Sequence, residues 1–171
     1  MVAHKNNQIE LKPISEYNIL MEKKCDACEF IKAPKNQILA TDYWTVGIGN
    51  DQPYLGRAYC TLKRHEGTLG DLSKEEWDDL QPIFKELEQR YTNVFGAELI
   101  NVECNMNHAF KSEPFNPHVH WHIYPRYSSS VEVAGVVFED SLFGSHIDED
   151  LVNIVDDTVV AEIVSKLKAR I

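Results

Sequence analysis

The chain has 171 residues, of which 43% are hydrophobic and 26% are charged, and its formal net charge at pH 7 is −10. This length and composition predict a single globular domain, residues 1–171, with one sizeable core. The acidic balance disfavours a broad nucleic-acid surface, because phosphate contacts need clustered Lys and Arg side chains. A small anionic substrate remains compatible with this charge if the site itself is locally positive.

The beginning of the chain, residues 1–12, is polar and lacks the apolar segment of a signal peptide. No stretch approaches the ~20 apolar residues that a membrane span needs. We therefore expect a cytoplasmic protein that binds neither membranes nor nucleic acids. In that compartment its four cysteines are expected as thiols or metal ligands rather than as disulfides.

The first predicted elements are a loose arm or edge strand over residues 1–12 and a short helix over residues 14–23. Cys25-Asp26-Ala27-Cys28 follows them. Two cysteines at this spacing can supply half of a tetrahedral zinc site, or they can be incidental thiols in a turn. A redox role is disfavoured, because no thioredoxin-like strand and helix pattern follows.

Three short strands are predicted next, over residues 37–41, 44–48 and 56–62, with a turn cluster at 49–53. The third strand ends in Lys63-Arg64-His65. This basic tip has three interpretations: it holds a phosphate, it brings His65 to the two cysteines, or it is a solvated strand end.

A long helix is predicted from residue 74, because Ser73 and Glu76 form a capping box. Apolar residues then recur at helical spacing as far as Val94, and Gly96 is a stop signal. Pro82 is expected to kink this helix or to shorten its first turns. The aromatic residues along the helix are interpreted as core.

A fourth strand is predicted over residues 98–107, with apolar and polar side chains alternating. Its polar face carries Asn101, Asn105 and Asn107. Amide side chains offer both a donor and an acceptor, so this face suits substrate positioning. The alternative is a polar face that simply meets solvent.

The most informative stretch is residues 116–126, in which His118, His120 and His122 stand at every second position. Valine, tryptophan and isoleucine alternate with them. Such residues share one face of a β-strand, so the imidazoles would look into a site while the apolar face packs on a core. Aligned imidazoles suit metal binding or a covalent mechanism in which one of them attacks phosphorus.

The rest of the chain is predicted to hold a further strand or extended cover over residues 131–138 and a C-terminal helix over 156–171. The apolar side of this helix is expected to pack on the domain or on a partner subunit.

The stretch His118-Val119-His120-Trp121-His122-Ile123-Tyr124 resembles the motif of the histidine triad, or HIT, family of nucleotide hydrolases and transferases. The order of elements over residues 25–127 is also similar to that family, with residues 128–171 as an extension. The resemblance implies an α+β fold, in which a five-stranded antiparallel sheet packs with a long helix and a C-terminal helix. It also implies a homodimer.

The resemblance implies roles for the site residues. His120 would attack the α-phosphorus of a dinucleoside polyphosphate or nucleotide conjugate and form a nucleotidyl-histidine intermediate. His122 would bind the phosphoryl oxygens, and His118 would shape the site or ligate zinc. The candidate substrate-binding residues are Asn50, Arg57, Asn105 and Asn107.

Two other functions are open at this point. One is a non-catalytic nucleotide-binding sensor or interaction module that retains the histidine face. The other is a metalloenzyme that holds one metal with all three histidines. Some proteins of the family bind structural zinc through four positions that correspond to Cys25, Cys28, His65 and His118. This Cys₂His₂ set would offer zinc tetrahedral coordination, which argues against the metalloenzyme.

Two positions depart from the family pattern. Arg57 occupies the place of a fourth histidine; we expect its guanidinium to clamp phosphate near His120, the alternative being an ion pair with Asp51. Glu113-Pro114-Phe115 replaces a Gly-Gln-Ser/Thr segment, so a hydroxyl that assists the leaving group in many members is missing. Both departures argue against a simple phosphoramidase.

Overall fold

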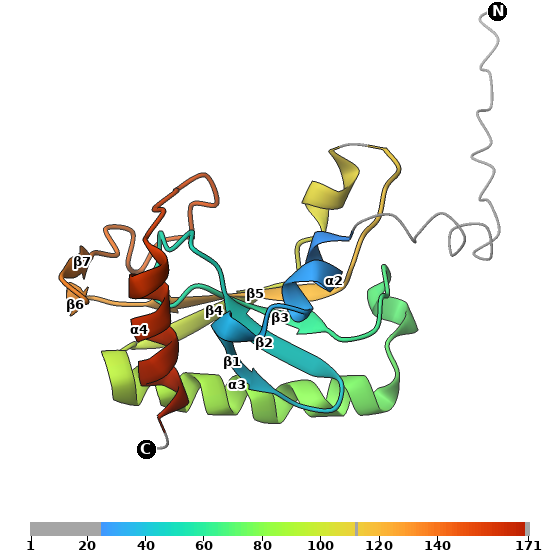
Figure 1. Cartoon of the computed structure of the whole chain (residues 1–171), viewed down its shortest axis with the longest axis horizontal. Coiled ribbons are helices and arrows are strands. Elements are labelled where there is room, and N and C mark those ends of the chain that lie inside the picture. The colour runs from blue at the N-terminus through green and yellow to red at the C-terminus, as the bar shows by residue number, and fades with distance from the viewer. Residues whose placement is uncertain (1–24, 112, 170–171) are drawn as a thin grey trace, which may run out of the picture.

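The computed structural model describes residues 25–111 and 113–169, so the predicted arm at 1–12 and helix at 14–23 lie outside the described residues. An antiparallel sheet of five strands, in the order β1-β2-β3-β5-β4, forms its centre (Figure 1). The strands are β1 Gln37–Ala40, β2 Trp44–Ile48, β3 Ala58–Leu62, β4 Leu99–Glu103 and β5 His120–Arg126. The predicted α+β fold and the predicted sheet are confirmed.

Three α-helices accompany the sheet within the described residues: α2 Asp26–Ile31, α3 Lys74–Phe95 and α4 Asp157–Lys168. The long helix α3 lies along one side of the sheet, and the short helix α2 lies on the other (Figure 1). Short 3₁₀ helices occur at η1 Pro34–Asn36, η2 Leu69–Asp71 and η3 Asn107–Phe110. None of the helices in the described part is long and apolar enough to cross a membrane.

The ends of α3 are those predicted from the sequence. The Ser73 hydroxyl accepts a hydrogen bond from the Glu76 backbone N–H, and the Glu76 carboxylate accepts one from the Ser73 N–H. Gly96 ends the helix with a φ of 76°, which glycine adopts without a side-chain penalty. The helix begins at Lys74 and continues through Pro82, so its first turns are not shortened, and the alternative of a kink stays a prediction.

Burial explains why α3 tolerates the proline. Leu80, Ile83, Leu87 and Tyr91 are buried between the helix and the sheet. Burying each such side chain contributes about 1.5–3 kcal/mol, and a proline inside a helix costs about 3 kcal/mol. The packing therefore outweighs the loss.

The strand register places the histidines on the face of the sheet opposite α3. Thr61 pairs with His120, and Tyr59 pairs with His122. The intervening Trp121 packs against aromatic rings of α3, and its neighbours in the alternation, Val119 and Ile123, are fully buried. The predicted alternation of histidine and apolar faces is confirmed, although β5 begins at His120 rather than at His118.

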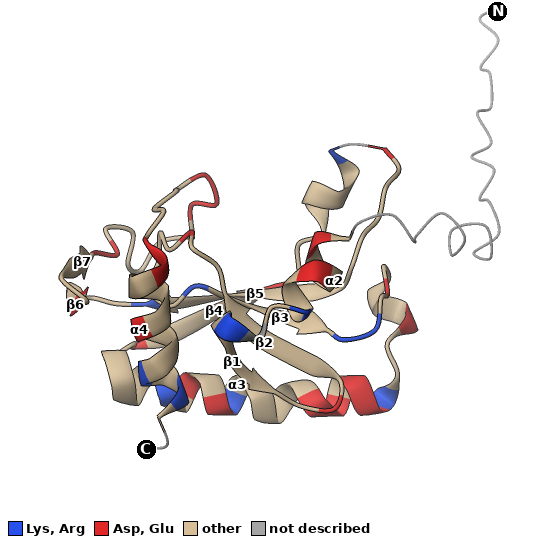
Figure 2. Ribbon diagram, viewed as in Figure 1, with Lys and Arg blue, Asp and Glu red and all other residues tan. Residues whose placement is uncertain are grey.

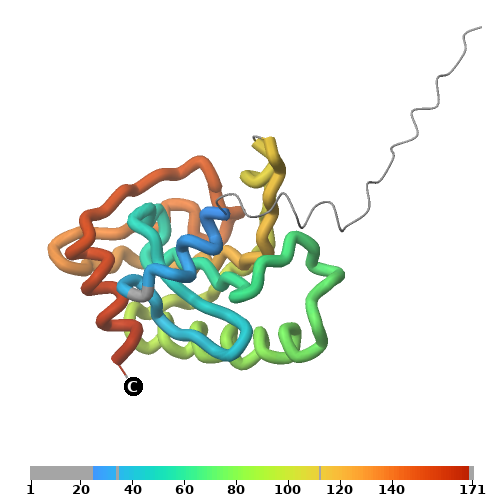
Figure 3. The backbone as a smooth tube through the Cα atoms, turned by 45° about the vertical axis from the view of Figure 1, so that its right-hand side comes forward, coloured from blue at the N-terminus to red at the C-terminus, as the bar shows by residue number. Residues whose placement is uncertain are grey.

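The fourth strand is shorter than predicted. β4 ends at Glu103, and Asn107 instead opens η3. Asparagine is depleted in strands because its side chain competes for nearby backbone groups, and Asn105 and Asn107 both stand in the lost portion. Residues 104–117, called here the η3 loop, stand out from the body of the molecule in two views (Figures 1 and 3). Residue 112 lies outside the described part of this loop.

The C-terminal extension, residues 128–169, packs on the same hydrophobic core. It begins with a hairpin of β6 Val131–Val133 and β7 Val136–Phe138, which turns at Ala134 and Gly135, both with positive φ. Helix α4 follows and lies beside β1, as Figure 3 shows. Its buried side chains include Val160, Ile163 and Leu167. The extension therefore covers an end of the sheet.

Candidate functional site

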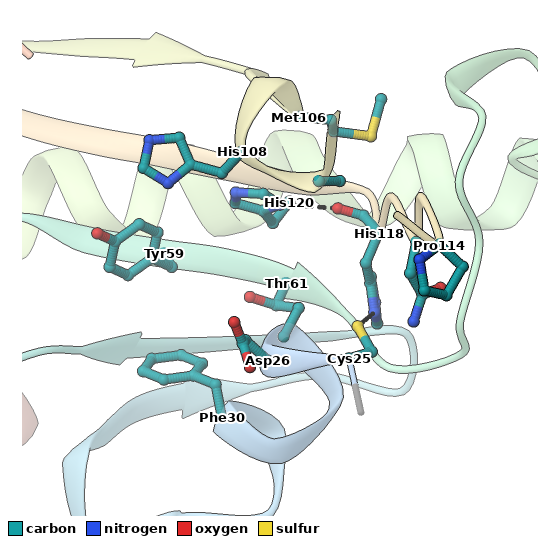
Figure 4. A pocket seen from close by; sticks show the side chains of 13 residues that line it. Cys25, Asp26, Phe30, Tyr59, Thr61, Met106, His108, Pro114, His118 and His120 are labelled. Carbon is teal, nitrogen blue, oxygen red and sulfur yellow. Dashed lines mark hydrogen bonds between the residues drawn. The ribbon is translucent and has the colours of Figure 1, made fainter. Parts of the chain in front are cut away.

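A cavity of about 410 Å³ opens between the histidine face of the sheet, α2 and the η3 loop (Figure 4). Small-molecule sites in proteins have volumes of about 300–1,000 Å³. Its lining includes Phe30 from α2, Tyr59, Thr61 and His120 from the sheet, and His108 and Asn116 from the η3 loop. The cavity can therefore admit part of a small-molecule ligand next to His120.

His120 has a fixed tautomer. Its Nδ1 lies 2.7 Å from the backbone carbonyl oxygen of His118, a contact marked by a dashed line in Figure 4. A carbonyl only accepts, so Nδ1 carries the ring proton and Nε2 carries the lone pair. No residue in the described part of the chain bonds to this Nε2. Burial lowers the pKa of His120, although the His118 carbonyl opposes this shift. The ring is therefore neutral and nucleophilic near pH 7.

His122 lies beside it, with 4.8 Å between the two ring centroids. Its Nε2 is 3.3 Å from the Asn105 carbonyl oxygen, and its Nδ1 is 3.3 Å from the Tyr124 hydroxyl. The first nitrogen therefore donates, and the second accepts from Tyr124. Burial, with a further contribution from His120, lowers the pKa of His122 to about 4. His122 is thus a neutral neighbour of His120 whose two nitrogens both bind protein groups.

His118 points away from this pair and into a cluster of sulfur and nitrogen atoms. Its Nδ1 lies 3.2 Å from the Cys25 Sγ and 3.4 Å from the Cys28 Sγ, and the His65 Nδ1 lies 3.4 Å from the Cys28 Sγ. All four ligand atoms lie within 4.8 Å of one another. In tetrahedral zinc sites, bond lengths of ~2.3 Å to sulfur and ~2.0 Å to nitrogen separate the two by about 3.5 Å. The cluster fits that arrangement.

Local structure explains why these four residues meet. Cys25 is the N-cap of α2, and its sulfur accepts from the Cys28 backbone N–H, so one helical turn brings both sulfurs together. His65 follows β3, and His118 precedes β5. The His118 Nε2 donates to the Leu62 carbonyl oxygen at 2.7 Å, which leaves Nδ1 unprotonated toward the thiols.

The position of α2 depends on a residue without a side chain. A Cβ atom at Gly47 would lie 2.9 Å from the Phe30 ring of α2. Glycine in the middle of β2 therefore lets α2 approach the histidine face closely enough to close the cavity and to present Cys25 and Cys28.

Arg57 lies at the His122 end of the same face. Its Nη1 is 2.8 Å from the Asp51 carboxylate, and its guanidinium carbon is 5.5 Å and 5.4 Å from the ring centroids of Tyr59 and Tyr124. The ion pair with Asp51, which was the alternative interpretation, is therefore present. The guanidinium also contributes to the lowered pKa of His122, after burial and the other contacts of that ring.

The three asparagines that were predicted to bind substrate do not line the cavity. The Asn50 amide donates to the Val155 carbonyl and to Asp157, so it tethers α4 and does not line the cavity. The Asn105 side chain donates to Glu149, and only its backbone carbonyl contacts the triad. Asn107 is exposed at the start of η3, next to His108.

The basic tip after β3 is occupied by protein groups. Arg64 forms ion pairs with Glu76 and Glu66, and Lys63 donates to the Thr41 carbonyl. The His65 side chain instead turns to Cys28, as one of the three interpretations of this tip predicted.

Sequence reasoning missed several residues of the site: Tyr59, Thr61 and His108 line the cavity, and Tyr124 bonds to His122. Tyr59 and Thr61 could have been found from the period of the third strand, once Thr61 was paired with a histidine. Tyr124 continues the histidine periodicity. His108 carries no such signal, because its place depends on the path of the η3 loop between β4 and β5.

A scan of protein-family models finds no match to the sequence, and a search of curated proteins finds no significant match. Solved structures do resemble it. A zinc-bound histidine triad family protein from Mycobacterium smegmatis has a TM-score of 0.55 at 18% identity, over 84% of this chain and 93% of that chain. A diadenosine triphosphate hydrolase from Plasmodium falciparum has a TM-score of 0.55 at 16% identity, over 78% and 74%.

A uridylyltransferase structure has a TM-score of 0.62 at 18% identity, covering 90% of this chain and 46% of its own. This chain therefore spans about half of that protein. The class that these likenesses and the sheet define is the histidine triad fold, with the histidine strand at the centre of the candidate site. Within that fold, this chain combines the three triad histidines, a Cys₂His₂ cluster and an arginine at position 57.

Proposed function

We propose that this protein is a histidine triad enzyme, a nucleotide hydrolase or nucleotidyl transferase whose substrate is a dinucleoside polyphosphate or nucleotide conjugate. One observation carries the proposal. The His118 carbonyl fixes the His120 tautomer, so the lone pair of a neutral Nε2 is available beside a cavity of nucleotide-accepting size. The likeness to a diadenosine triphosphate hydrolase and to a uridylyltransferase supports the same chemistry.

In the first step, the His120 Nε2 attacks the α-phosphorus. A P–N bond forms, the bond from phosphorus to the leaving oxygen breaks, and that oxygen keeps the electron pair. The imidazole carries a positive charge in this intermediate, which the Nδ1–H bond to the His118 carbonyl stabilises. His122 presents a neutral ring next to the reacting centre and can turn its Nε2–H from the Asn105 carbonyl to a phosphoryl oxygen.

In the second step, an acceptor attacks the same phosphorus and the P–N bond breaks, which returns the electron pair to Nε2. Water as acceptor gives a hydrolase, and a phosphate or sugar phosphate gives a transferase. In either case, the nucleotidyl group leaves on the acceptor and the histidine is regenerated.

Incubation with labelled diadenosine tetraphosphate tests the proposal. Wild-type protein should release a mononucleotide, and samples quenched in alkaline denaturant, in which a histidine P–N bond survives, should contain a nucleotidyl group on His120 by peptide mass spectrometry. His120→Ala should abolish both signals, while His146→Ala, an exposed histidine outside the cavity, should leave them unchanged. Tight nucleotide binding without turnover would instead favour the sensor interpretation.

We also propose that Cys25, Cys28, His65 and His118 bind one structural zinc ion. The sulfur–nitrogen distances and the tautomer of His118 support this, and a similar structure is zinc-bound. When bound, the metal supplies no reaction chemistry and braces α2, the end of β3 and the start of β5. Binding free energies for structural zinc reach on the order of 10 kcal/mol in peptides.

Elemental analysis and thermal unfolding test the zinc proposal. Purified protein should contain about one zinc per chain, as a Cys₂His₂ set implies. Cys25→Ser should lower both zinc content and melting temperature, and Cys104→Ser, outside the cluster, should keep the zinc. A metal-free preparation with unchanged stability would contradict the proposal.

A further inference from the structure

His108 is a histidine of the η3 loop that stands across the cavity from the sheet. It lines the cavity that His120 also lines, and Figure 4 shows both rings at that opening. A positive charge at His108 would lower the pKa of both His120 and His122. Phe110 and Phe115 link the two arms of the η3 loop, with their ring centroids 5.1 Å apart.

Lys111 is the partner of His108 within the loop. Its Nζ lies 3.2 Å from the His108 Nε2. An ammonium group only donates, so Nε2 accepts and the ring proton of His108 is on Nδ1. The Nδ1–H of His108 is therefore available as a donor, and the Lys111 ammonium group can supply a replacement proton through Nε2.

The proposed reaction needs such a donor for any leaving group more basic than a phosphate. The leaving oxygen acquires an electron pair when its bond to phosphorus breaks, and a poor leaving group must be protonated as this happens. Arg57 cannot supply the proton at ordinary pH, and Glu113-Pro114-Phe115 carries no hydroxyl. Histidine is the side chain that most often transfers such a proton in enzymes.

We infer that His108 is the catalytic acid that protonates the leaving group, with Lys111 as its proton reserve; this assignment rests on the proposed function. As His120 attacks, the Nδ1 proton of His108 passes to the leaving oxygen and a proton from Lys111 passes to Nε2. In the second step, the attacking water gives a proton to Nδ1, the P–N bond breaks, and the Nε2 proton returns to Lys111. At the end of the cycle, His108 and Lys111 carry the same protons as at the start. The leaving group has gained one proton, and the attacking water has lost one.

Leaving-group dependence tests this role. Two esters of adenosine 5′-monophosphate serve as probes: a p-nitrophenyl ester, whose leaving group needs no proton, and a simple alkyl ester, whose leaving group does. His108→Gln retains a polar side chain but cannot transfer a proton. It should slow turnover of the alkyl ester by about 100-fold or more, and that of the p-nitrophenyl ester by less than about threefold.

Two further variants complete the experiment. Lys111→Gln should produce a smaller loss with the same preference for the alkyl ester. His146→Gln makes the same change at an exposed histidine outside the cavity and should alter neither rate. Equal losses on both esters, or no loss on either, would overturn the assignment.

The result separates the two proposals. If wild-type protein forms no nucleotidyl-His120 intermediate with the p-nitrophenyl ester, the proposed function fails and the assignment of His108 fails with it. If the intermediate forms and His108→Gln shows no leaving-group dependence, only the role of His108 is overturned.

Discussion

Burial controls the protonation of His122, and this makes stability depend on pH. Its pKa in the folded protein is about 4, below the value of about 6.5 that an unfolded chain gives. As the pH falls through 6.5, the unfolded chain takes up a proton first, so stability falls between about pH 6.5 and 4 and levels off below. Above pH 6.5 both states are neutral and this contribution is constant.

Replacing His122 should remove the part of this acid-induced loss of stability that protonation of its ring causes. We expect His122→Gln to lose less unfolding free energy than wild type between pH 7.5 and 4.5, measured by urea titration. Protonation of the Cys₂His₂ cluster acts in both proteins and cancels in the comparison. Equal losses in the two proteins would show that His122 does not titrate in this window.

Arg57 places a positive charge at the His122 end of the site. The ion pair with Asp51 and the contacts with two tyrosine rings fix the position of its guanidinium. We predict that Arg57→Ala reduces turnover of diadenosine tetraphosphate by about 100-fold, the typical cost of losing one preorganised transition-state donor. Arg57→Lys should also be impaired, because lysine lacks the planar fork.

Asp51→Asn is the control for Arg57, because it weakens the ion pair and keeps the cation. If Arg57→Ala retains wild-type turnover and nucleotide affinity, Arg57 serves only to hold the Asp51 turn, whose carboxylate also accepts from the Asn153 backbone N–H.

At this scale, the sequence predicted which side chains share the histidine face but not what each one contacts. A period of two is a property of the strand itself, so His120 and His122 could be placed together. The Asn50 amide was assigned to substrate and binds α4 instead, because its partners are more than 100 positions away. Such contacts leave no local pattern.

Elements with local end signals were predicted accurately. The capping box at Ser73 and the glycine at 96 define α3 through hydrogen bonds within a few residues. β4 was predicted too long, because strand length depends on pairing with β5 and on where the chain must leave the sheet. The face of β4 was recoverable from the sequence, but its end was not.

A buried ion pair connects β5 to the C-terminal extension. The guanidinium of Arg126 and the carboxylate of Asp140 are both 2% exposed, with an Nε–Oδ2 distance of 2.6 Å. The remaining guanidinium nitrogens bind Asn101 and the Ser145 and Leu142 carbonyls. The charge of Arg126 is thus fully enclosed by polar partners.

We predict that Asp140→Asn lowers the free energy of unfolding by about 3 kcal/mol, because it leaves the Arg126 charge buried without its counter-ion. Asp78→Asn provides the matched control, since Asp78 pairs with Lys74 on the surface and such pairs contribute less than about 1 kcal/mol. Chemical denaturation of both variants measures the difference. Similar losses would mean that other contacts of Arg126 hold the extension.

At the scale of the whole molecule, β4 is an edge of the sheet. Leu99 and Val102 on this strand are 41% and 38% exposed. An unprotected edge strand with apolar side chains favours pairing with another chain. Acidic side chains are prominent along α3 in Figure 2.

We therefore expect the homodimer implied by the family resemblance, and we expect β4 to take part in it. Light scattering should give twice the mass of one chain. Val102→Lys should shift the protein toward monomer, whereas Val152→Lys, at an exposed position outside the sheet, should not. A monomeric wild-type protein at micromolar concentration would contradict the prediction.

The position of His118 has a consequence beyond the Cys₂His₂ cluster. Its ring contacts the two thiols and the Leu62 carbonyl, while its own carbonyl orients His120. The side chain that contacts both thiols and the backbone carbonyl that fixes the His120 tautomer belong to one residue. A substitution at position 118 would remove an imidazole from the cluster, and any shift of the backbone that follows would also move the carbonyl that orients His120.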